Sequence, residues 1–293
     1  MNVRKAVIPA GGLGTRLLPL SKAVPKELSP VFDKPLVQLA AEELAGVGIE
    51  ETVLVVSPGK PALETFFSPD PALEHSLRSS GNPLADMVAA IPNLSRFSFV
   101  EQAHPLGLGH AVLMAAGAVG DGPFATLLPD DIVLHHRSAT QQLLEVFQHH
   151  DGCVLAVEEG ATEHISQYGV IDGNEVEEGV YRVNRLVEKP TPEEAPSNLA
   201  IVGRYILMPQ IFDALQNTPP GAKGEIQLTD AIGLLLDEQP VYACVLQGRR
   251  HDAGSPLGLL KASLDAAMRD PRHHEELREF IWSMTSPEQQ PGA

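Results

Sequence analysis

Lys5-Ala6-Val7-Ile8-Pro9-Ala10-Gly11-Gly12-Leu13-Gly14-Thr15-Arg16 is the stretch that decides the fold. Its first part, Lys5 to Pro9, is a short apolar run stopped by turn residues, and it predicts a buried β-strand. The glycines that follow lack Cβ atoms, so their backbone N–H groups can come close to a ligand and face phosphate oxygens. Arg16 adds a forked positive charge. The stretch therefore indicates either a phosphate-binding loop or a plain tight turn.

Two familiar phosphate-binding patterns do not fit this stretch. The dinucleotide fingerprint G-x-G-x-x-G would need glycine where Leu17 stands, and the pattern G-x-x-x-x-G-K-[ST] is not found in the sequence. The loop therefore predicts neither a dinucleotide-dependent dehydrogenase nor a P-loop NTPase.

The composition excludes several classes of partner. The 293-residue chain is 43% hydrophobic, which is ordinary for a globular protein, and its formal net charge is −17. Nucleic acids and anionic membranes need a basic surface, so neither is expected as a partner. Cys153 and Cys244 are too few for a disulfide framework and are predicted to be reduced core thiols. The apolar run ending at Pro9 is too short for a signal peptide, and no stretch reaches transmembrane length, so we expect the cytoplasm.

The order of the predicted elements is typical of an α/β fold. A helix at 36–46 lies between the first strand and a second at 51–56, which makes a βαβ unit with a parallel sheet. Four prolines predict a loop over 17–34. Short strands within 160–196 indicate an antiparallel flap, and 241–246 is expected to be the last clear strand. We therefore expect a Rossmann-like, mixed but mainly parallel sheet flanked by helices, with a small flap laid on it.

Three polar side chains lie beside the predicted turns. Lys26 belongs to the same long loop as Arg16, so it either completes a two-cation phosphate site or is a solvated charge. Glu27 would then face a donor such as a base edge or a sugar hydroxyl. Gln102 ends a predicted strand just before the turn at 107–109, where its amide could contact a base edge; a packing turn is the equal alternative.

Charged residues also follow three other strands. Asp130 and Asp252 lie just beyond strand ends, where ligands gather in open α/β sheets. Asp130 could hold a hard cation such as Mg²⁺, with a loop acid or helix cap as the alternative. Glu188 and Lys189 close a strand of the flap, where a carboxylate can accept from hydroxyls and an ammonium can hold a phosphate; a surface pair is the alternative. Adjacent histidine pairs show no ligand spacing and are predicted to be solvated: His135-His136, His149-His150 and His273-His274.

With these segments in order, the chain resembles the bacterial UTP–glucose-1-phosphate uridylyltransferases, within the wider family of sugar-phosphate nucleotidylyltransferases, from Lys5 to about Leu264. The wider family shares the glycine loop, Lys26 and Glu188-Lys189-Pro190. The uridylyltransferase branch is matched by Pro25-Lys26-Glu27, Gly107-Leu108-Gly109-His110-Ala111, Leu128-Pro129-Asp130, Ala195 to Tyr205 and Gly224 to Ile232. Gly12 departs from this branch, which more often has alanine there, and is shared with the thymidylyltransferases.

The resemblance implies the nucleotide-diphospho-sugar transferase fold and a role for each matching residue. The uracil and ribose would be surrounded by Ala10, Gly11, Glu27, Gln102 and Gly107, and the triphosphate would be held by Gly14, Thr15, Arg16 and Lys26. The glucose would be lined by Gly169, Glu188 and Ile201, with Lys189 on the sugar phosphate. Asp130 and Asp252 would bind Mg²⁺. The catalytic residues would be Arg16, Lys26 and Lys189.

The implied reaction joins UTP and glucose 1-phosphate into UDP-glucose with release of pyrophosphate, by direct Mg²⁺-assisted in-line displacement. Its nucleophile is an ionised phosphate, so no general base is needed, which fits the lack of any Ser/His/Asp or Cys/His arrangement. The alternatives are a glucose-1-phosphate thymidylyltransferase and a non-catalytic relative that binds sugar nucleotides.

The resemblance also implies a homo-oligomer, either a dimer or a tetramer. We expect a single domain over 1–282, with a nucleotide-binding part at about 1–157, a sugar-binding part at about 158–254 and C-terminal helices at 255–282. Residues 283–293 are expected to form a disordered tail.

Overall fold

A nine-stranded mixed sheet forms the centre of the structure, a computed structural model that describes residues 2–160, 162–221 and 224–285. Its strands, in spatial order, are β5 (Arg96–Glu101), β4 (Glu51–Val56), β1 (Lys5–Ala10), β6 (Phe124–Leu127), β11 (Leu199–Leu207), β8 (Cys153–Glu159), β12 (Val241–Val245), β10 (Val180–Glu188) and β9 (Gly169–Glu177). The first four are parallel to one another, and β11 runs antiparallel to both of its neighbours β6 and β8. This arrangement confirms the predicted α/β class.

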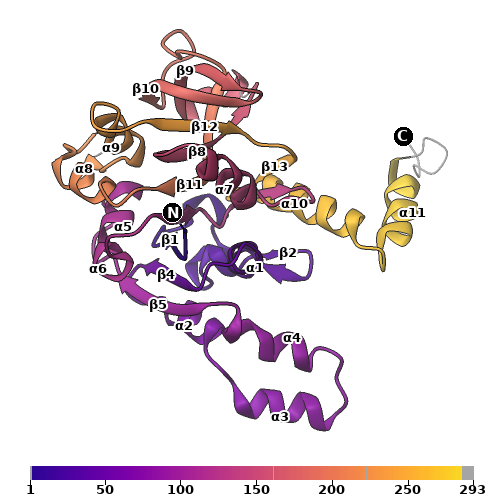
Figure 1. Ribbon diagram of the computed structural model, residues 1–293. Helices are drawn as coiled ribbons and strands as arrows, with labels where there is room; N and C mark the ends of the chain where they lie inside the picture. The colour runs from indigo at the N-terminus through magenta and orange to yellow at the C-terminus, as the bar shows by residue number, and fades with distance from the viewer. Residues whose placement is uncertain (1, 161, 222–223, 286–293) are drawn as a thin grey trace.

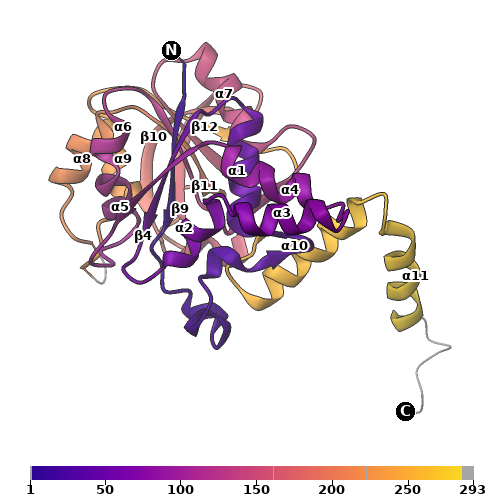
Figure 2. The same ribbon diagram turned by 90° about the horizontal axis from the view of Figure 1, so that it is seen from below.

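Helices cover both faces of the sheet (Figures 1 and 2). One face packs against α1 (Leu36–Gly46), α2 (Pro61–Phe67) and α7 (Ala139–His149), and the other against α5 (Leu108–Met114), α6 (Ala116–Val119), α8 (Ile211–Asn217) and α9 (Leu228–Leu235). Successive side chains of a strand point to opposite faces. Accordingly Val7 packs in the core on the side of α5, α6, α8 and α9, whereas Ala6 and Ile8 pack in the core on the side of α1, α2 and α7. The strands are therefore apolar on both faces, as parallel strands between two helical layers must be.

A short two-stranded sheet brings distant parts of the chain to one edge. It pairs β7 (Asp131–Leu134) with β13 (Arg249–Asp252), and its register places Asp131 opposite Asp252. Ile132 packs there against Ala253 and against Ala262 of α10 (Pro256–Arg269). Because β7 follows β6 directly, this pairing sets Asp130 beside the end of β13. Neither β7 nor β13 was predicted from the sequence, and β13 follows the segment at 241–246 that was expected to be the last clear strand.

The predicted flap differs in its attachment. Its strands β9 and β10 form an antiparallel hairpin, but they continue the main sheet at its edge, through β12, rather than lying on it. The predicted loop at 17–34 contains two single 3₁₀ turns, Leu20–Lys22 and Lys26–Leu28, and ends in the small hairpin of β2 (Pro30–Val31) and β3 (Lys34–Pro35). Prolines exclude a long helix from this segment without excluding short turns.

Two parts of the chain project from the body. Helices α3 (Pro71–Ser79) and α4 (Ala85–Ala90) form one of them, and α11 (His274–Thr285) extends away beyond α10 (Figure 1). Residues 283–285 of the expected disordered tail are helical, and 286–293 lie outside the described residues. Within the described ranges, no helix is both long and apolar enough to cross a membrane.

Candidate active site

Two cavities meet at the carboxyl ends of the central strands. The glycine-loop cavity has a volume of about 520 Å³, and its lining includes Gly11, Gly14, Lys26, Gln102 and Gly107. The flap cavity has a volume of about 340 Å³, and its lining includes Arg16, Gly169, Glu188, Lys189, Ile201 and Asp252. Both cavities share four lining residues: Leu108, Leu128, Asp130 and Glu225. The two predicted halves of the site therefore adjoin along a common wall.

Glycines let the backbone form the walls of the glycine-loop cavity. Gly14 has φ 64° and Gly107 has φ 101°, conformations that residues with a Cβ rarely adopt. A Cβ on Gly107 would lie 2.7 Å from the Ile226 carbonyl oxygen. The same segment is tied down by the N–H of Ile226, which donates to the Leu106 carbonyl over 2.7 Å. Gly107 is thus required both by its own φ and by the close approach of this neighbouring chain.

Gln102 is fixed at the end of β5 by two acceptors. It is 5% exposed, and its Nε2 lies 3.2 Å from the Gly107 carbonyl oxygen and 2.9 Å from His110 Nδ1. A Cβ on Gly11 would lie 2.7 Å from Gln102 Oε1, so the amide oxygen lies against the glycine loop. Gln102 therefore places an oriented amide in the wall of the cavity.

Ala10 and Glu27 lie beneath the loop instead of lining the cavity. Both are 0% exposed, and neither belongs to the cavity walls. Lys60, which the sequence analysis did not single out, reaches the same place from the start of α2: its Nζ lies 3.1 Å from Glu27 Oε2, 2.8 Å from the Ala10 carbonyl oxygen and 2.9 Å from that of Gly12. Burial raises the pKa of Glu27, and the Lys60 charge opposes this shift in part.

The contacts of Lys60 orient the loop above it. In a planar trans peptide, the C=O and the N–H of the following residue point in opposite directions. Because the carbonyls of Ala10 and Gly12 point toward Lys60, the N–H groups of Gly11 and Leu13 point the other way. Gly11 and Leu13 line the cavity, and among the described residues their N–H groups donate to no protein acceptor. These two donors are therefore available to an anion.

Lys26 and Asp130 form a short, largely buried ion pair. Their Nζ and Oδ2 atoms are 2.6 Å apart, and the side chains are 19% and 16% exposed. Burial opposes both charges, but each partner outweighs it, so the pKa of Lys26 is raised and that of Asp130 is lowered. Both side chains are therefore charged near neutral pH.

Arg16 and Asp252 form a second ion pair beside the first, with 2.8 Å between Nη1 and Oδ2. A Cβ on Gly254 would lie 2.8 Å from Asp130 Oδ2 and 3.0 Å from Asp252 Oδ1, and it would collide with Arg16 Nη2. The two predicted carboxylates therefore converge on Gly254, although they are 122 residues apart in the sequence (252 − 130). Gly254 leaves room for this convergence because it has no side chain.

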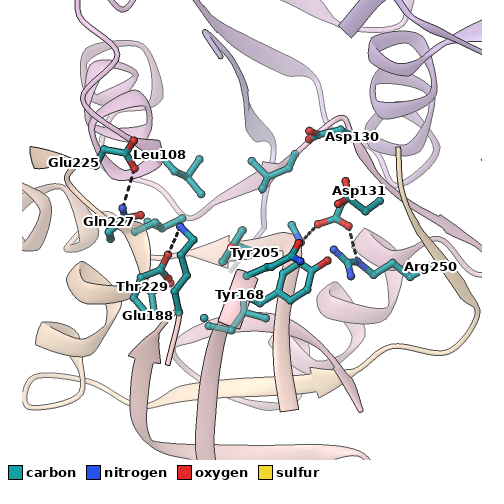
Figure 3. A pocket seen from close by; sticks show the side chains of 18 of the residues that line it. Leu108, Asp130, Asp131, Tyr168, Glu188, Tyr205, Glu225, Gln227, Thr229 and Arg250 are labelled. Atoms are coloured by element: carbon teal, nitrogen blue, oxygen red, sulfur yellow. Dashed lines mark hydrogen bonds and ion pairs between the residues drawn. The ribbon is translucent and has the colours of Figure 1, made fainter. Parts of the chain in front are cut away.

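The flap cavity carries charges of both signs. Lys189 follows β10 with φ 46°, an uncommon conformation for a residue other than glycine, and its N–H donates to the Tyr168 carbonyl over 3.0 Å. Its Nζ lies 2.8 Å from Glu188 Oε1. Figure 3 shows Glu188 and Thr229 across the cavity from Asp130. An anionic ligand in this cavity would meet Lys189 on one side and Arg16 on another.

Arg250 braces the wall of the flap cavity and was not predicted. Its guanidinium donates to Asp131, lies 3.3 Å from Glu158 Oε2 and stacks 4.6 Å from the ring centre of Tyr168 (Figure 3). Burial opposes its charge, but Asp131 outweighs burial and raises the pKa of Arg250. A sequence pattern gives little sign of Arg250, because its partners come from β7, β8 and the segment before β9.

The two convergent carboxylates suit a hard divalent cation. Within the described residues, no group of three or more His, Cys, Asp and Glu side chains could hold a metal by itself. Mg²⁺, however, is commonly bound by one or two carboxylates together with substrate phosphates and water. Asp130 and Asp252 fit such a shared site, and their present partners Lys26 and Arg16 are cations that a phosphate could draw away.

Comparison with known proteins agrees with this geometry. The family model described as "Nucleotidyl transferase" matches residues 5–269. The chain is 43% identical over 282 residues to the UTP–glucose-1-phosphate uridylyltransferase YngB of Bacillus subtilis (strain 168), with 96% of this chain and 95% of that protein covered. Its resemblance to these uridylyltransferases is thereby confirmed.

Solved structures of related proteins share the fold of this chain. A UDP-glucose pyrophosphorylase complexed with UDP-glucose has 40% sequence identity and a TM-score of 0.83, covering 92% of this chain and 100% of that chain. A UTP-bound UGPase from Acinetobacter baumannii has 37% identity and a TM-score of 0.86, covering 96% and 99%. The fold predicted from the resemblance is therefore confirmed.

Proposed function

The chain belongs to the nucleotidyl transferase family, and we propose that it transfers the uridylyl group of UTP to glucose 1-phosphate, giving UDP-glucose and pyrophosphate. The observation that carries this proposal is the pair of adjoining cavities. One is walled by backbone N–H groups, an amide and Lys26, and the other by Glu188, Lys189 and Arg16. Such a site can hold a nucleoside triphosphate and a sugar phosphate end to end.

The nucleotide occupies the glycine-loop cavity in this proposal. Gly11, Gln102 and Gly107 contact the uracil and ribose, and Gly14, Thr15, Arg16 and Lys26 hold the triphosphate. This orientation is supported by the N–H groups of Gly11 and Leu13, which have no protein acceptor among the described residues, and by two cations: Lys26 lines this cavity and Arg16 lines the adjoining one. Ala10 and Glu27 act from beneath the loop, and Glu27 keeps one buried oxygen, Oε1, without a hydrogen-bond donor among the described residues.

Glucose 1-phosphate occupies the flap cavity. Gly169, Glu188 and Ile201 line the sugar, with the Glu188 carboxylate accepting from its hydroxyls, while Lys189 holds the phosphate. A Cβ on Gly169 would lie 2.8 Å from Thr229 Oγ1 and 3.0 Å from Ile201 Cδ1, so this wall leaves no room for a larger residue. When the sugar phosphate binds, Lys189 releases Glu188 and contacts the phosphate instead.

The reaction is an in-line attack of a glucose 1-phosphate oxygen on the α-phosphorus of UTP. The attacking phosphate is already ionised, so the residues must chiefly position two polyanions. Two unit charges 4 Å apart repel by about 4 kcal/mol at an effective dielectric of 20. Lys189 positions the nucleophile, while Arg16 and Lys26 exchange their carboxylate partners for the triphosphate and stabilise the leaving pyrophosphate.

We also propose that Mg²⁺ is the metal, held by Asp130 and Asp252 together with the phosphates. When bound, Mg²⁺ would supply positive charge to the reacting phosphates. The proposed metal site is supported by the convergence of these two carboxylates on Gly254. Lys26 and Arg16 are the ion-pair partners of these two carboxylates.

The rival activity is a thymidylyltransferase, which shares the chemistry but prefers dTTP. Steady-state kinetics with UTP and dTTP against glucose 1-phosphate separates the two. We expect a higher kcat/KM for UTP, and a preference for dTTP would assign the rival activity. Binding of UTP without turnover of any sugar 1-phosphate would instead support a non-catalytic relative.

We further propose a homo-oligomer of single-domain subunits, with the domain spanning 1–282, that works in the cytoplasm. Exposed apolar side chains near the C-terminus support self-association: they include Leu257 and Leu260 of α10 and Phe280, Trp282 and Met284 of α11. Trp282 is 74% exposed, which is unusual for so large an apolar side chain. The free thiols of Cys153 and Cys244 suit a reducing compartment. Sedimentation of the purified chain would show whether it is a dimer or a tetramer.

A further inference from the structure

Both N–H donors of the Gln102 side chain are engaged away from the nucleotide. One faces the Gly107 carbonyl oxygen at 3.2 Å, and the other faces His110 Nδ1 at 2.9 Å. A primary amide has two N–H donors and one carbonyl acceptor. Only Oε1 therefore remains, and it lies beside Gly11 in the wall of the glycine-loop cavity.

The orientation of this amide determines with which base edge it can form a hydrogen bond. Uracil carries an imide N–H between two carbonyl groups, so it can donate to an amide oxygen. Cytosine carries an unprotonated ring nitrogen at that position, and it would place a lone pair against the same oxygen. A reversed amide would present N–H donors and favour cytosine. A site that leaves buried polar groups unpaired rejects the wrong ligand strongly.

We propose that His110 is a specificity-determining positioning residue: its Nδ1 accepts from Gln102 and holds the amide with its oxygen toward the base, so that UTP is preferred over CTP. This inference rests on the proposed function, since it assumes a nucleotide in the glycine-loop cavity. His110 lies in the first turn of α5, two residues after Leu108, which lines that cavity. His110 itself does not line the cavity, so it acts through Gln102.

The surroundings of His110 suit an acceptor role. Burial lowers the pKa of His110, and the nearby His104 lowers it further, so the ring is neutral at neutral pH and its Nδ1 can accept a hydrogen bond. The Gly107 carbonyl by itself holds only one of the two N–H groups. Loss of the His110 acceptor therefore leaves the amide held at one point and free to reorient at modest cost.

The test compares His110→Phe, which removes the acceptor, with His110→Asn, which can place an amide oxygen near the Nδ1 position. His104→Phe is the matched control, because His104 is exposed and lies in the same segment without contacting the Gln102 side chain. The measurements are KM and kcat for UTP and CTP with glucose 1-phosphate, together with thermal unfolding; His110→Leu serves if His110→Phe does not fold.

We expect His110→Phe to lower the UTP-to-CTP ratio of kcat/KM by about tenfold, mainly through KM, which is the effect of losing one good hydrogen bond. His110→Asn should recover most of the ratio, and His104→Phe should leave it unchanged. An unchanged ratio in His110→Phe, or an equal change in His104→Phe, would overturn the inference. If the wild-type chain binds UTP but releases no pyrophosphate, the proposed function fails, and calorimetric titration with UTP and CTP then tests the same ratio.

Discussion

Replacing Lys60 by methionine removes the cation beneath the glycine loop while keeping most of its volume. In the wild-type chain Lys60 and Glu27 form an ion pair whose side chains are 14% and 0% exposed, and Lys60 also donates to the carbonyls of Ala10 and Gly12. Lys60→Met leaves Glu27 buried without its ion-pair partner. Breaking a buried pair from one side costs about 3–5 kcal/mol, so we expect a loss of unfolding free energy of that order.

The loss of unfolding free energy in Lys60→Met should depend on pH in a defined direction. Burial already raises the pKa of Glu27, and loss of Lys60 raises it further because, of the two opposing positive charges, only the smaller contribution, that of Lys26, remains. A carboxyl group whose pKa is higher in the folded than in the unfolded state destabilises the fold as pH rises above its unfolded value. Lys60→Met should therefore cost more at pH 8 than at pH 5, where Glu27 can bind a proton.

Urea unfolding of four proteins at both pH values tests this reasoning: wild type, Lys60→Met, Glu27→Gln and the double variant. We expect the double variant to lose less free energy than the sum of the two single losses, because removing both partners leaves no buried charge unpaired. The KM for UTP should rise in Lys60→Met, since the loop N–H groups lose their support. Additive losses, or a penalty equal at pH 5 and pH 8, would refute the account of Lys60.

Three further substitutions test the site itself. Asp130→Asn should abolish pyrophosphate release and also lower the melting temperature, because Lys26 loses its charged partner, while the variant still folds; wild-type rates would contradict the role of Asp130 in the mechanism. Lys189→Ala should raise the KM for glucose 1-phosphate at least tenfold while changing that for UTP little; an unaltered KM for the sugar phosphate would contradict its role. Gly254→Ala should lower kcat about tenfold by displacing the carboxylates, whereas the control Gly46→Ala, which has open space around it, should not. Equal kcat values in these two variants would argue against the convergence at Gly254.

Local patterns predicted most of the fold because each main strand is a short apolar run bounded by turn residues. β1, β4 and α1 were predicted to within one residue of their bounds. β7 and β13 were missed because each has only four residues and each pairs with a segment far away in the sequence.

The site residues that could be predicted have a local sequence signal, and those that could not be predicted depend on partners far away in the sequence. Gly11, Gln102 and Asp130 stand next to glycine turns or strand ends, so their sequence context already indicates a ligand. Lys60 has no such signal. Its partners are Glu27, 33 residues earlier, and loop carbonyls 48 and 50 residues earlier, and only the folded chain brings them together. Its position also explains why Glu27 lies beneath the cavity rather than in its lining.

The central claim is that one site joins a uridylyl group to glucose 1-phosphate without an intermediate on the protein. Incubating the purified chain with UTP, glucose 1-phosphate and Mg²⁺, and quantifying both products, tests this claim most directly. We predict that pyrophosphate and UDP-glucose form in a one-to-one ratio, and that no pyrophosphate is released when the sugar phosphate is omitted. Absence of pyrophosphate with UTP, or its release without glucose 1-phosphate, would contradict the claim.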